Sequence, residues 1–145
     1  MRRSELKTGW SLALLVLNLC LSSIAAHAEN GSEKIAAAAA EKWLGQVDAG
    51  KYAESWKEAS TYFQGAVAEK AWVESLNGIR KPLGKLVSRK LKNARNVHSL
   101  PGAPDGDYVV MQFDTSLVHK KSAVETVTFV REKSSKWKAA GYYIK

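Results

Sequence analysis

Hydrophobic residues recur at helical spacing in the first half of the chain and at alternate positions in the second half. Between residues 36 and 47 they fall three and four positions apart, which predicts an amphipathic helix that begins near Asn30 or Ser32. The helix is expected to end between Asp48 and Gly50, because glycine readily adopts the left-handed conformation beyond a last helical turn. The apolar face of this helix consists of Ala36, Ala39, Ala40, Trp43, Leu44 and Val47.

Two shorter helices are predicted next. The segment GKYAESWKEAS, residues 50–60, places Tyr52 and Trp56 four positions apart, so both rings lie on one helix face. We interpret this pair mainly as a contact between helices, and only Trp56 is a candidate for a pocket wall. A turn over residues 60–65 leads to a third helix, which stops at Pro82. Its apolar positions are Trp72, Val73, Leu76 and Ile79.

Strand patterns begin after Lys85. Four segments separated by turn sequences predict strands over residues 86–98, 108–117, 123–132 and 137–144. Helices followed by such strands predict an α+β fold, with three N-terminal helices packed on one face of a four-stranded antiparallel sheet. In the second strand, Val109, Met111, Phe113, Thr115 and Leu117 alternate with Tyr108, Val110, Gln112, Asp114 and Ser116.

The first 28 residues have the three-part pattern of a secretory signal peptide. Cations stand at the start, an apolar run covers residues 10–21, and the triplet AHA ending at Ala28 satisfies the small-x-small rule for cleavage. The run is shorter than the ~20 apolar residues that span a bilayer. We therefore expect residues 1–28 to be removed and residues 29–145 to form one domain that is secreted, and periplasmic in a Gram-negative source.

Cys20 is the sole cysteine of the chain. Leu19 stands before it, where a lipid-attachment site requires a small residue, so we do not expect lipidation. Removal of the signal segment takes Cys20 away, and a mature domain without cysteine depends on its core for stability. The segment also carries three cations and one carboxylate, so its removal lowers the net charge from +8 to +6.

A stretch without any carboxylate, residues 79–103, contains seven cations. Their positive field would attract anionic envelope polymers, although we favour a solvated face that protects a strand edge from aggregation. No aromatic residue interleaves for base stacking, so a specific nucleic-acid role is not expected. The seven cations are Arg80, Lys81, Lys85, Arg89, Lys90, Lys92 and Arg95.

Residues suited to metal or nucleophilic chemistry are sparse. The predicted mature chain holds His98 and His119 at no ligand spacing, and it has no serine in a GxSxG turn, so we expect neither a metal nor a cofactor. The best acid–base candidate is Asp114, which would need an apolar pocket for this role. A solvated or lysine-paired Asp114 is the interpretation that we favour, and Glu125 on the next strand is a weaker candidate.

The order of helices and strands resembles the cystatin-like or nuclear transport factor two-like cone, in which a curved sheet wraps a helix and leaves a pocket at its wide end. Four strings are more particular: VDAGKYAESWKEAS, AWVESLNGIRKPLGKLVSRKL, SLPGAPDGDYVVMQFDTS and SSKWKAAGYYIK. Over residues 34–145 they resemble the secreted bacterial family called domain of unknown function 4019. The resemblance implies the cone fold and no assigned activity. At the third helix, Val67 and Ala68 stand where the family tends to have a Ser or Thr cap.

These observations favour a binding protein over an enzyme, while the residues leave catalysis open. The leading hypothesis is a non-catalytic pocket for a small apolar or amphipathic ligand or a peptide. One alternative is an isomerase- or hydratase-type enzyme that uses Asp114, and another is a binder of anionic envelope polymers through the segment from Lys85 to Arg95. Pairing of two copies through their sheets is left open. The pocket candidates are Trp56, Trp72, Tyr108, Gln112, Asp114 and Tyr142.

Overall fold

The computed structural model describes the backbone of residues 13–145 and the side chains from Gly31 onward. The start of the predicted signal segment therefore lies outside the described residues. The chain divides into two compact units, Met1–Gly31 and Ser32–Lys145. The second unit, which we call the folded unit, contains every site described below.

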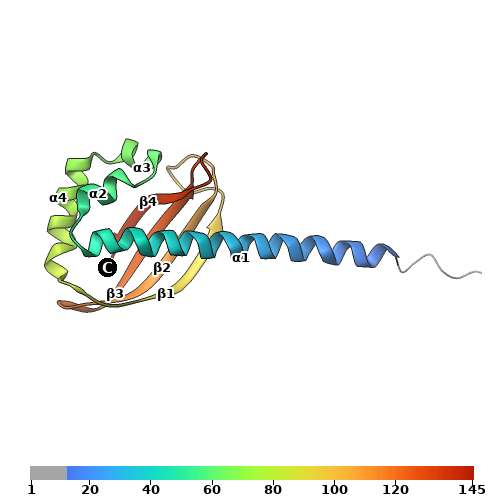
Figure 1. Cartoon of the computed structure of the whole chain (residues 1–145), viewed down its shortest axis with the longest axis horizontal. Helices are drawn as coiled ribbons and strands as arrows, with labels where there is room; N and C mark the ends of the chain where they lie inside the picture. Colours follow the sequence, from blue (N-terminus) through green and yellow to red (C-terminus); the bar gives the residue numbers. More distant parts are fainter. Residues whose placement is uncertain (1–12) are drawn as a thin grey trace, which may run out of the picture. The chain divides into compact units, whose positions relative to one another are not determined.

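Within residues 13–145, four α-helices and a short 3₁₀-helix precede the sheet, and Figure 1 shows their arrangement. The first helix ends at Asp48 as the sequence predicted, but it begins at Ala13 and not at Asn30 or Ser32. The residues before Asn30 are rich in leucine and alanine and contain no proline, so nothing in them stops helix formation. The elements are α1 (Ala13–Asp48), α2 (Tyr52–Lys57), α3 (Thr61–Ala66), α4 (Glu69–Ile79) and η1 (Lys81–Leu83).

Helix α3 occupies the segment for which the sequence predicted a turn. Its N-cap is Ser60, whose Oγ accepts a hydrogen bond from the Phe63 amide at 3.1 Å. The Thr61 amide donates to Glu132 Oε1 at 2.8 Å, so a residue distant in sequence satisfies another free amide of the first turn. Helix α4 begins after Ala68, which has no side-chain cap.

The sheet contains four antiparallel strands in sequential order and is not closed into a barrel. All four predicted strands are present, and the third starts three residues earlier than expected. Shifts in register interrupt each pair of strands, and such bulges bend a sheet. The strands are β1 (Leu86–Val97), β2 (Tyr108–Leu117), β3 (Lys120–Arg131) and β4 (Trp137–Ile144).

Apolar side chains pack between the helices and the sheet. Within the folded unit, α1 lies across one face of the sheet (Figure 1) and packs its apolar stripe against the inward positions of β2 and β3. An aromatic cluster lies beside this layer, with ring centroids 5.1 to 6.1 Å apart. Its members are Trp43, Phe63, Trp72, Phe129 and Tyr142. Among the described residues, no helix is long and apolar enough to cross a membrane.

Candidate functional site

The polar atoms of the aromatic cluster are satisfied inside the protein. Trp43 Nε1 donates to the carbonyl oxygen of Ser55 at 2.8 Å, and Trp72 Nε1 donates to Ser55 Oγ at 3.0 Å. The Ser55 hydroxyl in turn donates to the carbonyl oxygen of Tyr52 at 2.7 Å. Since a buried indole nitrogen without an acceptor is costly, these bonds hold both tryptophan rings in place. Tyr52 is buried in the core, as its helical spacing indicated.

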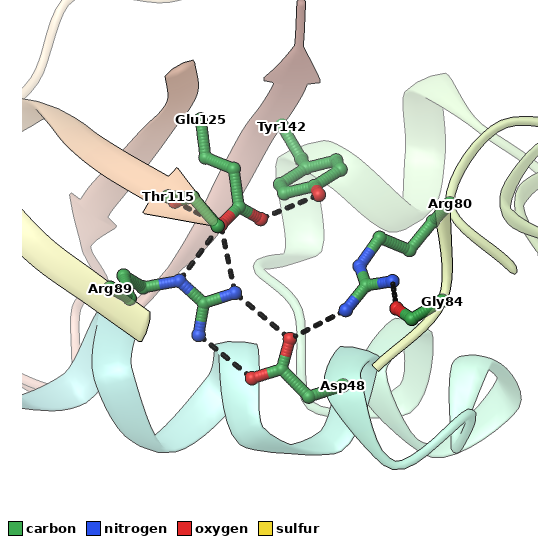
Figure 2. Close-up of polar contacts among 7 residues, drawn as sticks. All are labelled: Asp48, Arg80, Gly84, Arg89, Thr115, Glu125 and Tyr142. Carbon is green, nitrogen blue, oxygen red and sulfur yellow. Dashed lines mark hydrogen bonds and ion pairs between the residues drawn. The ribbon is translucent and has the colours of Figure 1, made fainter. Parts of the chain in front are cut away.

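A network of charged side chains lies buried between the end of α1 and the sheet (Figure 2). Arg89 of β1 links its two carboxylates. The Nη1 atom of Arg89 donates to Asp48 Oδ2 at 2.7 Å, and its Nε atom donates to Glu125 Oε1 at 2.8 Å. The exposed fraction is 9% for the Arg89 side chain and zero for Glu125. Figure 2 shows the guanidinium plane of Arg89 between the two acids.

Further donors complete the network. Thr115 Oγ1 donates to Glu125 Oε1 at 2.8 Å, and the Tyr142 hydroxyl donates to Glu125 Oε2 at 2.7 Å. Arg80 Nη2 donates to Asp48 Oδ1 at 3.1 Å, and Arg80 Nη1 donates to the carbonyl oxygen of Gly84 at 2.6 Å. Two acids and two arginines thus balance in charge, and both oxygens of each carboxylate have a partner.

The surroundings of the network set the protonation of Arg89 and Tyr142. Burial alone would lower the pKa of Arg89, but the hydrogen bonds and charges of Asp48 and Glu125 outweigh it and raise that pKa. Burial, and after it the charge and hydrogen bond of Glu125, raises the pKa of Tyr142. The tyrosine therefore keeps its proton and remains a donor.

The network is suited to holding elements together, not to catalysis. Apart from Arg80 Nε, which is buried without a hydrogen-bond partner, the polar atoms are directed at one another, and the fully buried carboxylate of Glu125 has no access to solvent. It joins the end of α1, through Asp48, to all four strands and, through Arg80, to the chain that follows α4. Each strand contributes one side chain, namely Arg89, Thr115, Glu125 and Tyr142 in the order β1 to β4. Among the described residues, no group of three or more His, Cys, Asp or Glu side chains could hold a metal ion.

An apolar groove lies beside this network, between α4 and β4, and encloses about 370 Å³. Trp72 and Tyr142, both predicted from the sequence as pocket residues, line it together. Two large apolar side chains among its lining residues are exposed, Ile79 at 57% and Tyr143 at 61%. The remaining lining residues are Phe63, Val67, Ser75, Leu76, Gly141 and Ile144. Apolar side chains predominate in the lining of this α4–β4 groove.

Trp56 does not belong to the groove. It is half-buried, packs against the core, and donates from Nε1 to the carbonyl oxygen of Val67 at 2.7 Å.

The other three candidate pocket residues lie on β2 away from the helices, so the structure does not bring them to the groove. Asp114 has a side chain that is 59% exposed and lies 3.6 Å from Lys92 Nζ. Gln112 accepts a hydrogen bond from Asn93 on the neighbouring strand at 3.1 Å. Tyr108 is buried, but its hydroxyl donates to the carbonyl oxygen of Pro104 at 2.6 Å. Their even-numbered positions on β2 face away from the apolar interior, so they cannot join Trp72 and Tyr142.

The basic segment also differs from the prediction. Arg80 and Arg89 are turned into the buried network and are unavailable to an external polymer. Five of the seven cations remain exposed, namely Lys81, Lys85, Lys90, Lys92 and Arg95. The segment has no acid of its own, and the compensating carboxylates come from α1 and β3.

Sequence reasoning missed the network, although one signal was present. Glu125 shares its strand parity with Ala123, Val127 and Phe129, which are buried, so an inward carboxylate could have been inferred from alternation alone. Such a carboxylate requires a charged partner. The sequence does not indicate that this partner is Arg89, because the pairing depends on the register of three strands.

Together the fold and the site define a small α+β protein with an apolar core, a charge-balanced buried network and an apolar groove beside the last strand. The chain belongs to the family described as protein of unknown function (DUF4019), whose model matches residues 39–142. The match includes every side chain of the network. No curated protein matches the chain.

Proposed function

We propose that the protein is a non-catalytic binding protein whose ligand, a small apolar or amphipathic molecule, enters the α4–β4 groove. The observation that carries this proposal is the exposure of Ile79 and Tyr143 beside a concave apolar surface. Large exposed apolar side chains around a hollow are typical of an interaction site. The groove volume of about 370 Å³ falls within the range of small-molecule sites.

The rigidity of the groove wall supports the same proposal. The ring of Tyr142 is held by Glu125 through its hydroxyl, and the ring of Trp72 is held by Ser55 through its indole nitrogen. A wall that is already ordered loses little side-chain entropy when a ligand binds. An apolar ligand therefore retains most of the free energy gained from leaving water.

The test uses the neutral apolar dye N-phenyl-1-naphthylamine and the protein with Ile79→Glu. Because Ile79 is exposed, the substitution leaves the core intact, and it introduces a charge into the groove. We expect dye affinity to fall about tenfold or more, since a lost apolar contact of ~1.4 kcal/mol corresponds to that factor. The matched control is Val87→Glu, at a 65% exposed position on β1, which should bind like the wild type.

Absence of dye binding, or equal binding by wild type and Ile79→Glu, would contradict the proposal. Displacement of the dye by an apolar peptide, but by no small compound, would reassign the groove to a peptide. The enzyme alternative through Asp114 receives no support from its exposed, lysine-paired position. Binding of an anionic polymer through the five exposed cations stays a prediction. Its affinity should fall steeply as the salt concentration rises.

We further propose that the protein acts outside the cytoplasm and that its fold belongs to the cystatin-like or nuclear transport factor two-like class. The signal pattern of residues 1–28 supports the location. A single open sheet bent by bulges, with one long helix across it, supports the fold class.

A further inference from the structure

We propose a second binding site, independent of the α4–β4 groove, that takes a single-chain amphiphile with an anionic head. It is a hollow of about 630 Å³ between α1, the end of α2 and the hairpin that joins β3 to β4. We call it the α1–hairpin pocket. Its apolar lining includes Trp43, Phe129 and Trp137.

The lining of this pocket is strongly basic. Four lysines and a single carboxylate, that of Glu58, contribute to it. The lysines come from three elements and are Lys42, Lys57, Lys136 and Lys138. In the described part of the chain, Lys57 forms one long ion pair, 4.0 Å from Glu69, and the other three lysines form none. An anion bound here would therefore meet several ammonium groups that have no internal partner.

A hydrogen-bonded turn in the hairpin forms part of the pocket. Ser135 has a φ of 67°, in the left-handed region. Its amide donates to the carbonyl oxygen of Glu132 at 2.8 Å, and the Glu132 amide donates to that of Lys136 at 2.8 Å. These bonds close the turn directly before Trp137, so Lys136 and Trp137 are held next to each other in the pocket wall.

The combination of apolar lining and surrounding charge selects the class of ligand. A polyanion such as a glycan or nucleic acid would leave the exposed side chain of Ile35 and the half-buried ring of Trp137 without a partner, and a neutral apolar ligand would leave the lysines unused. A carboxylate, phosphate or sulfate on one alkyl chain satisfies both parts, with the chain against Ile35 and Trp137. The alkyl chain gains free energy by leaving water for the apolar lining, and the anionic head is attracted by the lysines.

The experiment titrates the protein with decanoate at monomeric concentrations, by calorimetry and tryptophan fluorescence. The probe variant is Lys42→Gln with Lys136→Gln, because both side chains are exposed and their loss leaves the core intact. We expect decanoate affinity to fall about tenfold, the equivalent of ~1.4 kcal/mol. The control Lys90→Gln with Lys121→Gln removes the same charge from exposed sites on β1 and β3 and should bind like the wild type.

Several outcomes would overturn the proposal. These are equal losses in both double variants, affinity for decanol as high as for decanoate, and binding to anionic phospholipid vesicles without binding to free decanoate. The Ile79→Glu variant separates this pocket from the α4–β4 groove, because it should lose the neutral dye and keep wild-type affinity for decanoate. Weakened decanoate binding in that variant would contradict the independence of the two sites.

Discussion

Glu125 occupies an inward position of β3 between Ala123 and Val127, where a carboxylate is costly unless each oxygen is paired. Oε1 accepts hydrogen bonds from Arg89 and Thr115, and Oε2 accepts one from Tyr142. A buried ion pair of this kind adds little net stability over an apolar replacement. Removal of one partner, however, leaves the other charge buried and unpaired. A single substitution in the network should therefore lower the free energy of unfolding by far more than the few contacts it removes would suggest.

The substitution Glu125→Gln tests this consequence. It keeps the shape of the side chain and removes the charge opposite Arg89, so we expect the free energy of unfolding to fall by ~3 kcal/mol. Urea denaturation monitored by circular dichroism measures the change. The control Asp114→Asn breaks an exposed ion pair with Lys92 and should cost less than ~0.5 kcal/mol. Similar losses in the two variants would mean that Glu125 is not held as a buried charge.

Tyr142 predicts a dependence of stability on alkaline pH. Its pKa is raised in the folded protein, chiefly by burial, whereas the unfolded chain has the ordinary value of about 10. Above pH ~10 the unfolded state releases a proton that the folded state keeps, so the free energy of unfolding falls as pH rises. Tyr142→Phe should lower stability by ~1.5 kcal/mol at neutral pH and make the alkaline fall shallower.

Unfolding in urea between about pH 9 and pH 11 measures both effects in the wild type and in Tyr142→Phe. The variant should retain part of the slope, because burial also raises the pKa values of Tyr52 and Tyr108. An identical alkaline slope in both proteins would show that Tyr142 ionises as easily in the folded state as in the unfolded one.

At the scale of elements, the end of α1 determines where α2 and its aromatic residues go. Gly50 has a φ of 74°, and its amide donates to the carbonyl oxygen of Val47 at 3.1 Å. The next amide, of Lys51, donates to that of Gln46 at 2.9 Å. This reversal closes the helix and turns the chain so that Tyr52 enters the core.

A pair of glycine substitutions isolates the conformational requirement at this helix end. At both Gly50 and Gly45 an added Cβ would meet no atom within 4 Å, so packing does not distinguish the two positions. Gly50→Ala should destabilise by ~1 kcal/mol because of its left-handed conformation. Gly45→Ala, inside α1, should stabilise by ~0.5 kcal/mol through helix propensity. Thermal unfolding of the two variants gives the comparison, and a shift of the same sign in both would contradict it.

At the scale of the whole molecule, the boundary between the two compact units lies close to the predicted cleavage site. The folded unit begins at Ser32, and the signal pattern ends at Ala28. Cleavage there would leave the helical stripe, the buried network and both proposed sites on the mature chain.

We therefore expect a mature protein of 117 residues that starts at Glu29, because removal of residues 1–28 leaves that length. Expression of the whole gene product in a Gram-negative host, followed by intact-mass measurement of the periplasmic fraction, tests this. Ala28→Arg removes the small residue required at the cleavage site and should leave the precursor uncleaved. A wild-type chain that keeps Met1, or one lipidated at Cys20, would contradict the prediction.

Local patterns were enough to predict most of the elements and only part of the site. Alternation along β2 and helical spacing along α1 are properties of neighbouring residues, so both elements could be read directly. The helix α3 escaped prediction because its first turn depends partly on Glu132, which is distant in sequence. The aromatic character of Trp72 and Tyr142 marks them as candidate site residues, whereas Asp114 lies on the opposite face of β2, and alternation alone does not show on which side of the sheet a groove forms.

The amino-acid sequence by itself determined the α+β class, the order of the strands along the chain, the helix end at Asp48 and the apolar faces, because each depends on local spacing and turn chemistry. Tertiary structure alone decided which charges are free. Seven cations with no carboxylate between them resembled one basic surface, yet Arg80 and Arg89 are neutralised by Asp48 and Glu125, which reach them only after the strands pair and α1 packs on the sheet. A buried charge persists only beside a partner, and that partner is chosen by three-dimensional proximity.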